Sequence, residues 1–374
     1  MKYKINTNVT KKRQKYYIIN IYMQNKVKGK LYMNIFRDLD KIGIIPKNQL
    51  TVEERNYIAK NVASKLSDNL KYLLDSYNEI YMRLFNCNMY YAEIDKKFCG
   101  VFYYYKNNTI YIDINKNITN IDCYLIHECI HYLQNFNKIS KQSNRAGVCQ
   151  FQDFKIFGLG INEAIVQYIT AKALKNEMHR ISNNIITICT NSEDYYKYMT
   201  SLIGQILLLM GEEEAIESCL SSTDKFETKL YNTFEENTDK IVKSFDNILD
   251  ENNKPDRDEN KIINIYMQTQ ELIYSTYFAK MCKRLTTINE VDGEVEKLEN
   301  YSKIVGKLLG NSIEEEKFTI FKSQMDSKFL KKYVEVNRSH SKNSLTIVYK
   351  NAINNLWRKI ANFIQEKILK NKTN

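Results

Sequence analysis

Hydrophobic positions recur at helical spacing along most of this chain. Thr51 followed by Glu54 has the form of a helix capping box, and apolar residues spaced by three or four follow it, which predicts a long amphipathic helix. These apolar positions are Ile58, Val62, Leu66, Leu70, Leu73 and Leu74. The same spacing predicts helices over residues 121–136 and about 161–176, and further helical segments fill 193–248. The pattern therefore indicates a predominantly helical protein.

One segment, from Cys99 to Ile114, departs from the helical period. Aromatic and β-branched residues flank Lys106-Asn107-Asn108, which is typical of a β-hairpin with an Asn-rich turn. With the helices on either side, the pattern predicts an α+β fold that is mostly helical. We expect a small antiparallel hairpin or sheet beside the helices at 121–136 and 161–176, and a helical C-terminal region.

Residues 251–260 are polar throughout and contain Pro255, one of only two prolines in the chain. Such a stretch is typical of a linker. It divides the sequence into an N-terminal extension (1–50), a core (51–250), the linker (251–260) and a helical C-terminal region (261–374). Within the last region, five apolar residues are spaced to form one helical face: Ile353, Leu356, Ile360, Phe363 and Ile364.

The helix predicted over 121–136 carries the sequence His-Glu-x-x-His, formed by His127, Glu128 and His131. Residues four apart on a helix differ by about 40° of rotation and about 6 Å of rise, so both imidazoles can reach one metal ion. Glu128 can lie beside that ion without binding it, where a base must be to deprotonate metal-bound water. The alternative is a buried apolar helix with two hydrogen-bonded histidines, in which burying these polar groups would cost several kcal/mol, as a rough expectation, unless each were paired. A metal site removes that cost.

A hydrolytic zinc site needs a third protein ligand and an open fourth position. Downstream, two glycines precede a predicted helix whose first turn carries Asn162 and Glu163. Together the two motifs resemble those of the gluzincin, or thermolysin-like, metallopeptidases, whose third ligand is a glutamate on a second helix, often in an Asn-Glu-Ala setting. The resemblance implies that Glu163 binds one zinc ion together with His127 and His131. For Glu163 alone, the alternative is a carboxylate that favours a helix N-terminus electrostatically.

The resemblance extends over roughly residues 50–235 and implies a zinc-dependent peptidase acting on a peptide or protein substrate, with Glu128 as the general base. The metzincin pattern is excluded, because Gln134 and Asn137 stand where that class requires Gly and His. There is one departure: Gln167 stands four residues after Glu163, where thermolysin-like enzymes often have an acidic residue that orients a zinc-bound histidine. An amide oxygen can still accept the imidazole N–H, although it raises the ligand's basicity less.

Catalysis also needs a second donor to the developing oxyanion. The resemblance implies a Tyr or His in this role, and the sequence leaves four candidates open: Tyr195, Tyr196, Tyr198 and His179. Two rival functions remain. A peptidase-like module could keep zinc and bind a peptide without cutting it, an alternative that Gln167 favours and intact Glu128 disfavours. A helical scaffold with a chance motif would bind no stoichiometric metal.

Composition limits which binding partners and which cellular compartment we expect for this protein. The net charge of +11 accompanies an excess of Lys, Asn, Ile and Tyr, the residues of AT-rich codons, and there is no arginine-rich stripe, so we expect no nucleic-acid partner. No run reaches the roughly 18 apolar residues of a membrane span. The eight cysteines form no CxxC pair, which favours reduced thiols in the cytoplasm. The oligomeric state is not readable from the sequence.

Overall fold

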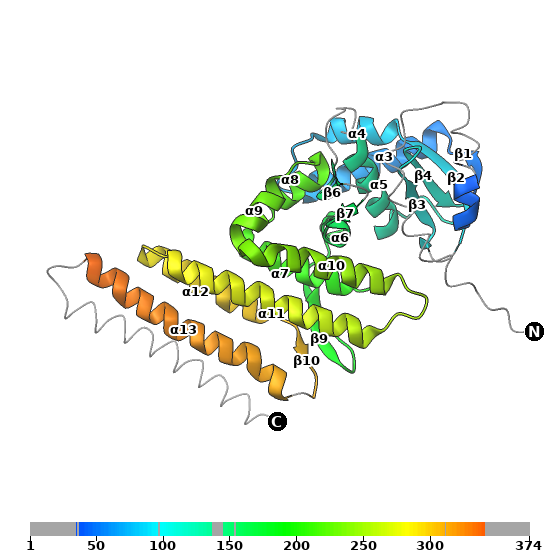
Figure 1. Ribbon diagram of the computed structural model, residues 1–374. Coiled ribbons are helices and arrows are strands. Elements are labelled where there is room, and N and C mark those ends of the chain that lie inside the picture. The colour runs from blue at the N-terminus through cyan, green and yellow to red at the C-terminus, as the bar shows by residue number, and fades with distance from the viewer. Residues whose placement is uncertain are drawn as a thin grey trace, which may run out of the picture. The chain divides into compact units, whose positions relative to one another are not determined.

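The computed structural model describes residues 35, 37–95, 98–136, 145–152, 155–310 and 312–340. It is an α+β protein dominated by helices, as predicted (Figure 1). The helices from residue 52 onward are α3 (Val52–Asn69), α4 (Tyr77–Phe85), α5 (Cys123–Phe136), α6 (Leu159–Ala173), α7 (Lys197–Met210), α8 (Glu213–Ser221), α9 (Lys225–Phe234), α10 (Thr238–Asn252), α11 (Glu259–Arg284), α12 (Ile288–Ile304) and α13 (Ser312–His340), with a 3-10 turn, η4, at Glu235–Asn237.

The strands form three small sheets. They are β1 (Ile44–Gln49), β2 (Asn88–Ile94), β3 (Val101–Tyr104), β4 (Thr109–Asp113), β5 (Arg145–Ala146), β6 (Cys149–Gln152), β7 (Lys155–Phe157), β8 (His179–Ser182), β9 (Ile186–Thr190) and β10 (Lys307–Leu308). Their orders are β1-β2-β4-β3, β5-β6-β7 and β10-β9-β8. The sequence pattern had indicated only the strands of the first sheet that lie between Cys99 and Ile114.

The predicted hairpin is confirmed as β3 and β4, which pair antiparallel. Its turn includes Asn108 with a φ of +54°, a left-handed conformation that asparagine tolerates better than most residues. The complete sheet is mixed, because β2 pairs parallel to β4 while β1 pairs antiparallel to β2. The strand β3 lies at the edge of this sheet and packs against α5, so the hairpin is beside the first histidine helix (Figure 1).

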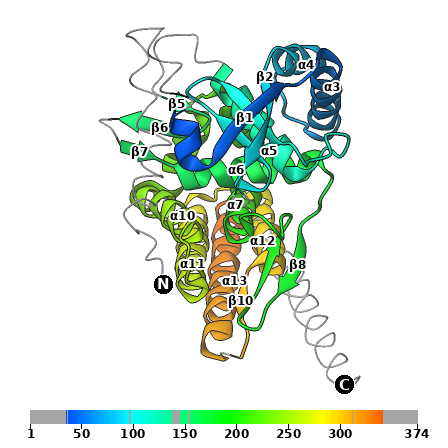
Figure 2. The same ribbon diagram turned by 90° about the vertical axis from the view of Figure 1, so that its right-hand side faces the viewer.

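The capping box predicted for α3 is present in full. The Thr51 side chain accepts from the Glu54 backbone N–H at 3.2 Å, and the Glu54 carboxylate accepts from the Thr51 N–H at 2.8 Å. The same arrangement, formed by Ser76 and Glu79, begins α4. Each box satisfies backbone donors that the first helical turn leaves unpaired. The two capped helices pack against each other (Figure 2).

The start of α6, which carries Glu163, is fixed by α10. A Cβ atom on Gly160 would lie 2.3 Å from the backbone carbonyl carbon of Phe245, so only glycine allows this approach. The Asp246 carboxylate then accepts from the Gly160 N–H at 2.7 Å and so caps α6 from the neighbouring helix. Burial raises the pKa of Asp246 to about 6, although the backbone N–H groups of Gly160 and Gly158 act to lower it. This contact fixes where the first turns of α6 lie.

Packing divides the described chain into two compact units. One runs to Tyr277 and includes Asn300–Glu316, and it holds all three sheets. The other comprises Phe278–Glu299 and the part of α13 from Lys317, where the Phe278 ring packs against those of Phe321 and Phe329.

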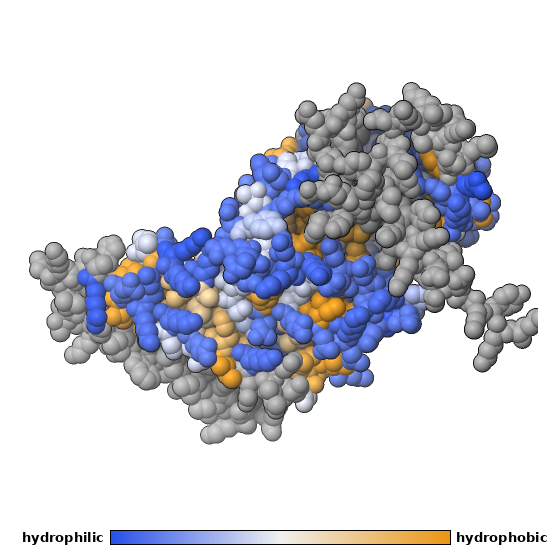
Figure 3. All heavy atoms as spheres, viewed as in Figure 1, coloured by the Kyte–Doolittle hydropathy of each residue, from blue (hydrophilic) through white to orange (hydrophobic). Residues whose placement is uncertain are grey.

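The polar segment 251–260 covers the end of α10, a short connection and the start of α11. The domain boundaries drawn from the sequence stay a prediction, and the apolar face from Ile353 to Ile364 lies outside the described residues. All eight cysteines are free thiols. Within the described part of the chain, no helix is long and apolar enough to cross a bilayer. The described residues visible in Figure 3 are mostly hydrophilic, with hydrophobic residues in several separate patches.

Candidate metal centre

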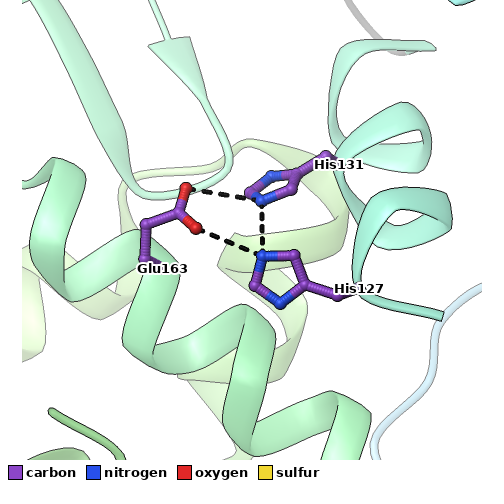
Figure 4. A group of neighbouring side chains, drawn as sticks. All are labelled: His127, His131 and Glu163. Atoms are coloured by element: carbon purple, nitrogen blue, oxygen red, sulfur yellow. Dashed lines mark hydrogen bonds and ion pairs between the residues drawn. The ribbon is translucent and has the colours of Figure 1, made fainter. Parts of the chain in front are cut away.

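Three side chains from two helices converge in the interior of the larger unit. His127 and His131 project from α5, and Glu163 projects toward them from α6 (Figure 4). All three are buried, with 1%, 7% and 8% of their surfaces exposed. The four-residue spacing on α5 places the two imidazoles one above the other, as the helical geometry requires. The residues predicted as metal ligands from the sequence are therefore brought together.

The ligand atoms of these side chains lie within a narrow range of separations. The two histidine Nε2 atoms are 3.0 Å apart. The Glu163 oxygens lie 3.2 Å from His127 Nε2 and 3.3 Å from His131 Nε2. Four ligands arranged tetrahedrally around an ion, with bonds of about 2.0–2.1 Å, stand about 3.3 Å apart. With one ligand atom from each residue, these atoms all lie within 4.8 Å of one another, so the group could hold a metal ion.

A chain of hydrogen bonds fixes the tautomer of His127. Its Nδ1 lies 2.9 Å from the Gln167 amide oxygen, and the Gln167 amide nitrogen lies 2.9 Å from Ser192 Oγ. Ser192 Oγ in turn donates to the main-chain carbonyl of Tyr195 at 2.7 Å. A carbonyl only accepts, so Ser192 must accept from the Gln167 NH₂, and the Gln167 oxygen must accept from His127. Nδ1 therefore carries a proton, and Nε2 is the nitrogen that can offer a lone pair to a metal ion.

Electrostatics in the cluster favour a positive charge. Burial alone would raise the pKa of Glu163, but His131 and His127 lower it well below its usual range. Burial opposes protonation of His131, yet the Glu163 carboxylate raises the pKa of His131 to about 9. Lone pairs and a carboxylate that face one another in a low-dielectric interior need a cation or a proton between them. A divalent metal ion meets this requirement, which is the fit expected of a metal site.

Competition between a proton and a metal ion for this site makes metal affinity, measured with zinc, depend on pH. A proton bound in the metal-free site must leave before zinc can bind. Because the pKa of His131 is raised to about 9, the affinity should increase by about tenfold per pH unit between pH 6 and pH 8. Competition with a chelator at several pH values, corrected for the protonation of the chelator itself, measures this slope. An affinity that stays constant over the interval would contradict it.

Glu128, the predicted base, is bonded to the sheet edge. It is on α5 between the two histidines, and its Oε2 accepts from the backbone N–H of Tyr103, on β3, at 2.8 Å. Burial raises the pKa of its carboxyl, which His131 and His127 partly oppose. Of the three motif residues, only the two histidines belong with Glu163 to the group that can hold a metal. Glu128 is thus anchored to the sheet edge, next to the ligands.

The structure separates the four candidates for an oxyanion donor. The rings of Tyr195 and Tyr196 lie 5.3 and 6.3 Å from the His127 ring, between centroids. Tyr196 has a φ of +54°, a strained conformation for a residue of this size. The Tyr198 hydroxyl instead donates to Glu259, and His179 pairs with Glu193 and is exposed. Tyr195 and Tyr196 are therefore brought to the centre, and the other two candidates are not.

The predicted contact between Gln167 and a histidine is present, and it has a measurable consequence. Replacing Gln167 by Ala removes the acceptor that orients His127, so zinc affinity should fall by about tenfold or more. Gln167→Glu should preserve or strengthen binding, since a carboxylate accepts the same N–H. Chelator competition at fixed pH measures both variants. Equal affinities for wild type and Gln167→Ala would show that this hydrogen bond does not support the metal.

The sequence analysis did not recognise the partner of the second histidine. His131 Nδ1 lies 3.0 Å from the amide oxygen of Gln134, three residues further along α5. Residues three apart share a helix face, and that spacing was the available signal. Asn162, read from the sequence only as the neighbour of Glu163, contacts Gln134 from α6.

No family model, curated protein or solved structure matches the chain. The site itself consists of two imidazoles and a carboxylate that lie close together, with Gln167 and Gln134 bonded to the two histidines. A fourth side chain, Glu128, stands beside this group without joining it.

Proposed function

We propose that the protein is a zinc-dependent peptidase, with zinc bound by His127, His131 and Glu163. The observation that carries this proposal is the convergence of the three ligand atoms, with the Glu128 carboxylate held next to them by Tyr103. Two imidazoles, one carboxylate and a neighbouring glutamate base are the parts of a hydrolytic zinc site. The proposal rests on this chemistry and on the resemblance of both sequence motifs to gluzincins.

A bound zinc ion would make a coordinated water acidic and polarise the carbonyl of the scissile bond. Glu128 would take a proton from the attacking water and return it to the leaving amine. Burial raises the pKa of its carboxyl, which favours the protonated form that returns the proton. A phenol of Tyr195 or Tyr196 donates to the developing oxyanion. Burial holds the pKa of both phenols above the ordinary value, so each keeps its proton for this purpose.

The direct test is cleavage of a mixed peptide library, followed by mass spectrometry of the products. Zinc-loaded protein should produce new termini, and a chelator should abolish them. Restoring zinc to the chelated protein should restore cleavage. If zinc-loaded protein cuts no peptide in the library, the proposed activity is contradicted, whatever the metal content.

A second candidate is a zinc-containing module that binds a peptide without cutting it. The observation that favours it is that the Nδ1 atoms of both histidines, which face away from the ligand group, bond to the neutral amides of Gln167 and Gln134 rather than to carboxylates. Amides raise the basicity of the imidazoles less and add no charge to the site. Retention of library peptides by zinc-loaded protein, with no new termini, would support this candidate over the peptidase.

The oxyanion donor can be identified by removing one hydroxyl at a time. Tyr195→Phe or Tyr196→Phe, whichever removes the donor, should lower kcat by about 10²–10³ and leave zinc content unchanged. Tyr198→Phe is the matched control, since its hydroxyl bonds to Glu259. Steady-state kinetics on a cleaved peptide measure the effect. Wild-type kcat in both Tyr195→Phe and Tyr196→Phe would exclude this role for the pair.

A further inference from the structure

The second histidine is supported by a pair of amides that bond to each other. His131 Nδ1 lies 3.0 Å from Gln134 Oε1. Gln134 Nε2 donates to Asn162 Oδ1 at 3.0 Å, and Asn162 Nδ2 donates back to Gln134 Oε1 at 3.4 Å. The second Gln134 N–H lies 2.9 Å from Cys219 Sγ. Gln134 and Asn162 are both buried, at 1% and 3% exposure, so each amide group has to be matched by a partner within the protein.

A main-chain group outside α5 and α6 determines how the amides of this relay, the hydrogen bonds that join Asn162, Gln134 and His131, are oriented. The backbone N–H of Val148 donates to Asn162 Oδ1 at 3.1 Å. A backbone N–H only donates, so the Asn162 oxygen must face it, and the Gln134 NH₂ must then face the same oxygen. The Gln134 oxygen is thereby left to accept from His131. His131 Nδ1 therefore carries a proton, and Nε2 is the nitrogen that faces the other ligand atoms, as in His127.

Val148 belongs to the turn that joins β5 to β6, and this turn contacts the amide groups of Gln134 and Asn162. Gly147, in the same turn, has a φ of +57°. A Cβ atom there would lie 2.2 Å from Asn162 Oδ1 and 2.4 Å from Gln134 Nε2. The Gly147 N–H donates to Ser222 Oγ at 2.8 Å, and Ser222 Oγ donates to the main-chain carbonyl of Gln134 at 3.0 Å. Only glycine fits where the turn meets the relay.

We propose that Gln134 and Asn162 are positioning residues for the metal, and that the Gly147-Val148 turn orients them so that His131 keeps its proton on Nδ1 and offers Nε2 to the metal. This inference rests on the metal centre of the proposed function, but not on hydrolysis. The turn is thereby a determinant of metal affinity, although none of its atoms is among the proposed ligands. Partners of metal-bound histidines at this distance typically change metal affinity by about 10–100-fold when removed.

The test compares two buried glutamines of equal size. Gln134→Leu removes the acceptor for His131. Gln205→Leu is its matched control, because Gln205 is fully buried and bonded to Tyr266 and Tyr301. Zinc affinity is measured by chelator competition, and stability by thermal melting of the metal-free full chain. Both variants should melt at lower temperature, but only Gln134→Leu should bind zinc more weakly, by about tenfold or more. Affinity equal to that of wild type in Gln134→Leu would overturn the proposal.

A second pair of variants tests the turn without replacing His131, Gln134 or Asn162. Gly147→Ala forces a Cβ atom into the amide pair, whereas Gly310→Ala places one at a φ of +75° with no atom within 4 Å. Both introduce backbone strain, but only Gly147→Ala should weaken zinc binding, again by about tenfold. If Gln134→Leu fails to fold, the two glycine variants decide the question. Equal zinc affinities for Gly147→Ala and Gly310→Ala would then overturn the proposal. Wild-type protein without stoichiometric zinc would overturn the metal centre as well, whereas zinc binding without peptide cleavage would contradict the peptidase alone.

Discussion

Replacing Glu128 by Gln should leave zinc content unchanged and lower kcat by about 10²–10⁴, the contribution of a general base. The amide has the same shape as the carboxylate and can still accept from the Tyr103 N–H that anchors Glu128. It cannot take a proton from water. The loss should therefore appear in the rate of peptide cleavage and not in folding or metal binding.

A carboxylate elsewhere serves as the control for this substitution. Glu54 also accepts from a backbone N–H, in the capping box of α3, so Glu54→Gln should keep wild-type kcat. Zinc content, melting temperature and cleavage kinetics are measured for both variants. Cleavage by Glu128→Gln at a rate comparable to that of wild type would rule out Glu128 as the base.

The local parts of the site were readable from the sequence. A four-residue spacing on a helix is enough to place His127 and His131 together, and it places Glu128 beside them, because helical geometry is the same in every protein. The capping box at Thr51 and the hairpin around Asn108 likewise depend on neighbouring residues. The position of Gln167 beside the site could be predicted for the same reason, because it lies one helical turn from Glu163.

Features that depend on distant segments were not readable. The parallel pairing of β2 with β4 joins segments on either side of the hairpin strand β3, and no local period signals it. The amide pair depends on where the β5–β6 turn docks on α5 and α6, which is set by tertiary packing. Tyr195 and Tyr196 could not be separated from Tyr198 among 28 tyrosines until their positions relative to His127 were known.

Removing a ligand should have the largest effect of all. In Glu163→Ala the site loses its only carboxylate ligand, and in His127→Ala it loses one of two imidazoles, so two protein donors remain where a zinc site of this type uses three. We expect both variants to retain less than about one-tenth of a zinc ion per chain after dialysis. Glu212→Ala is a suitable control, since that carboxylate bonds to Tyr168 and Lys172 on α6.

The central claim is that His127, His131 and Glu163 together hold a metal ion. Elemental analysis of the purified full-length chain, beside Glu163→Ala and Glu212→Ala, tests it most directly. The proposed zinc site predicts one zinc per chain in wild type and in Glu212→Ala, and almost none in Glu163→Ala. Wild-type protein without stoichiometric metal, or Glu163→Ala with the zinc content of wild type, would contradict the claim.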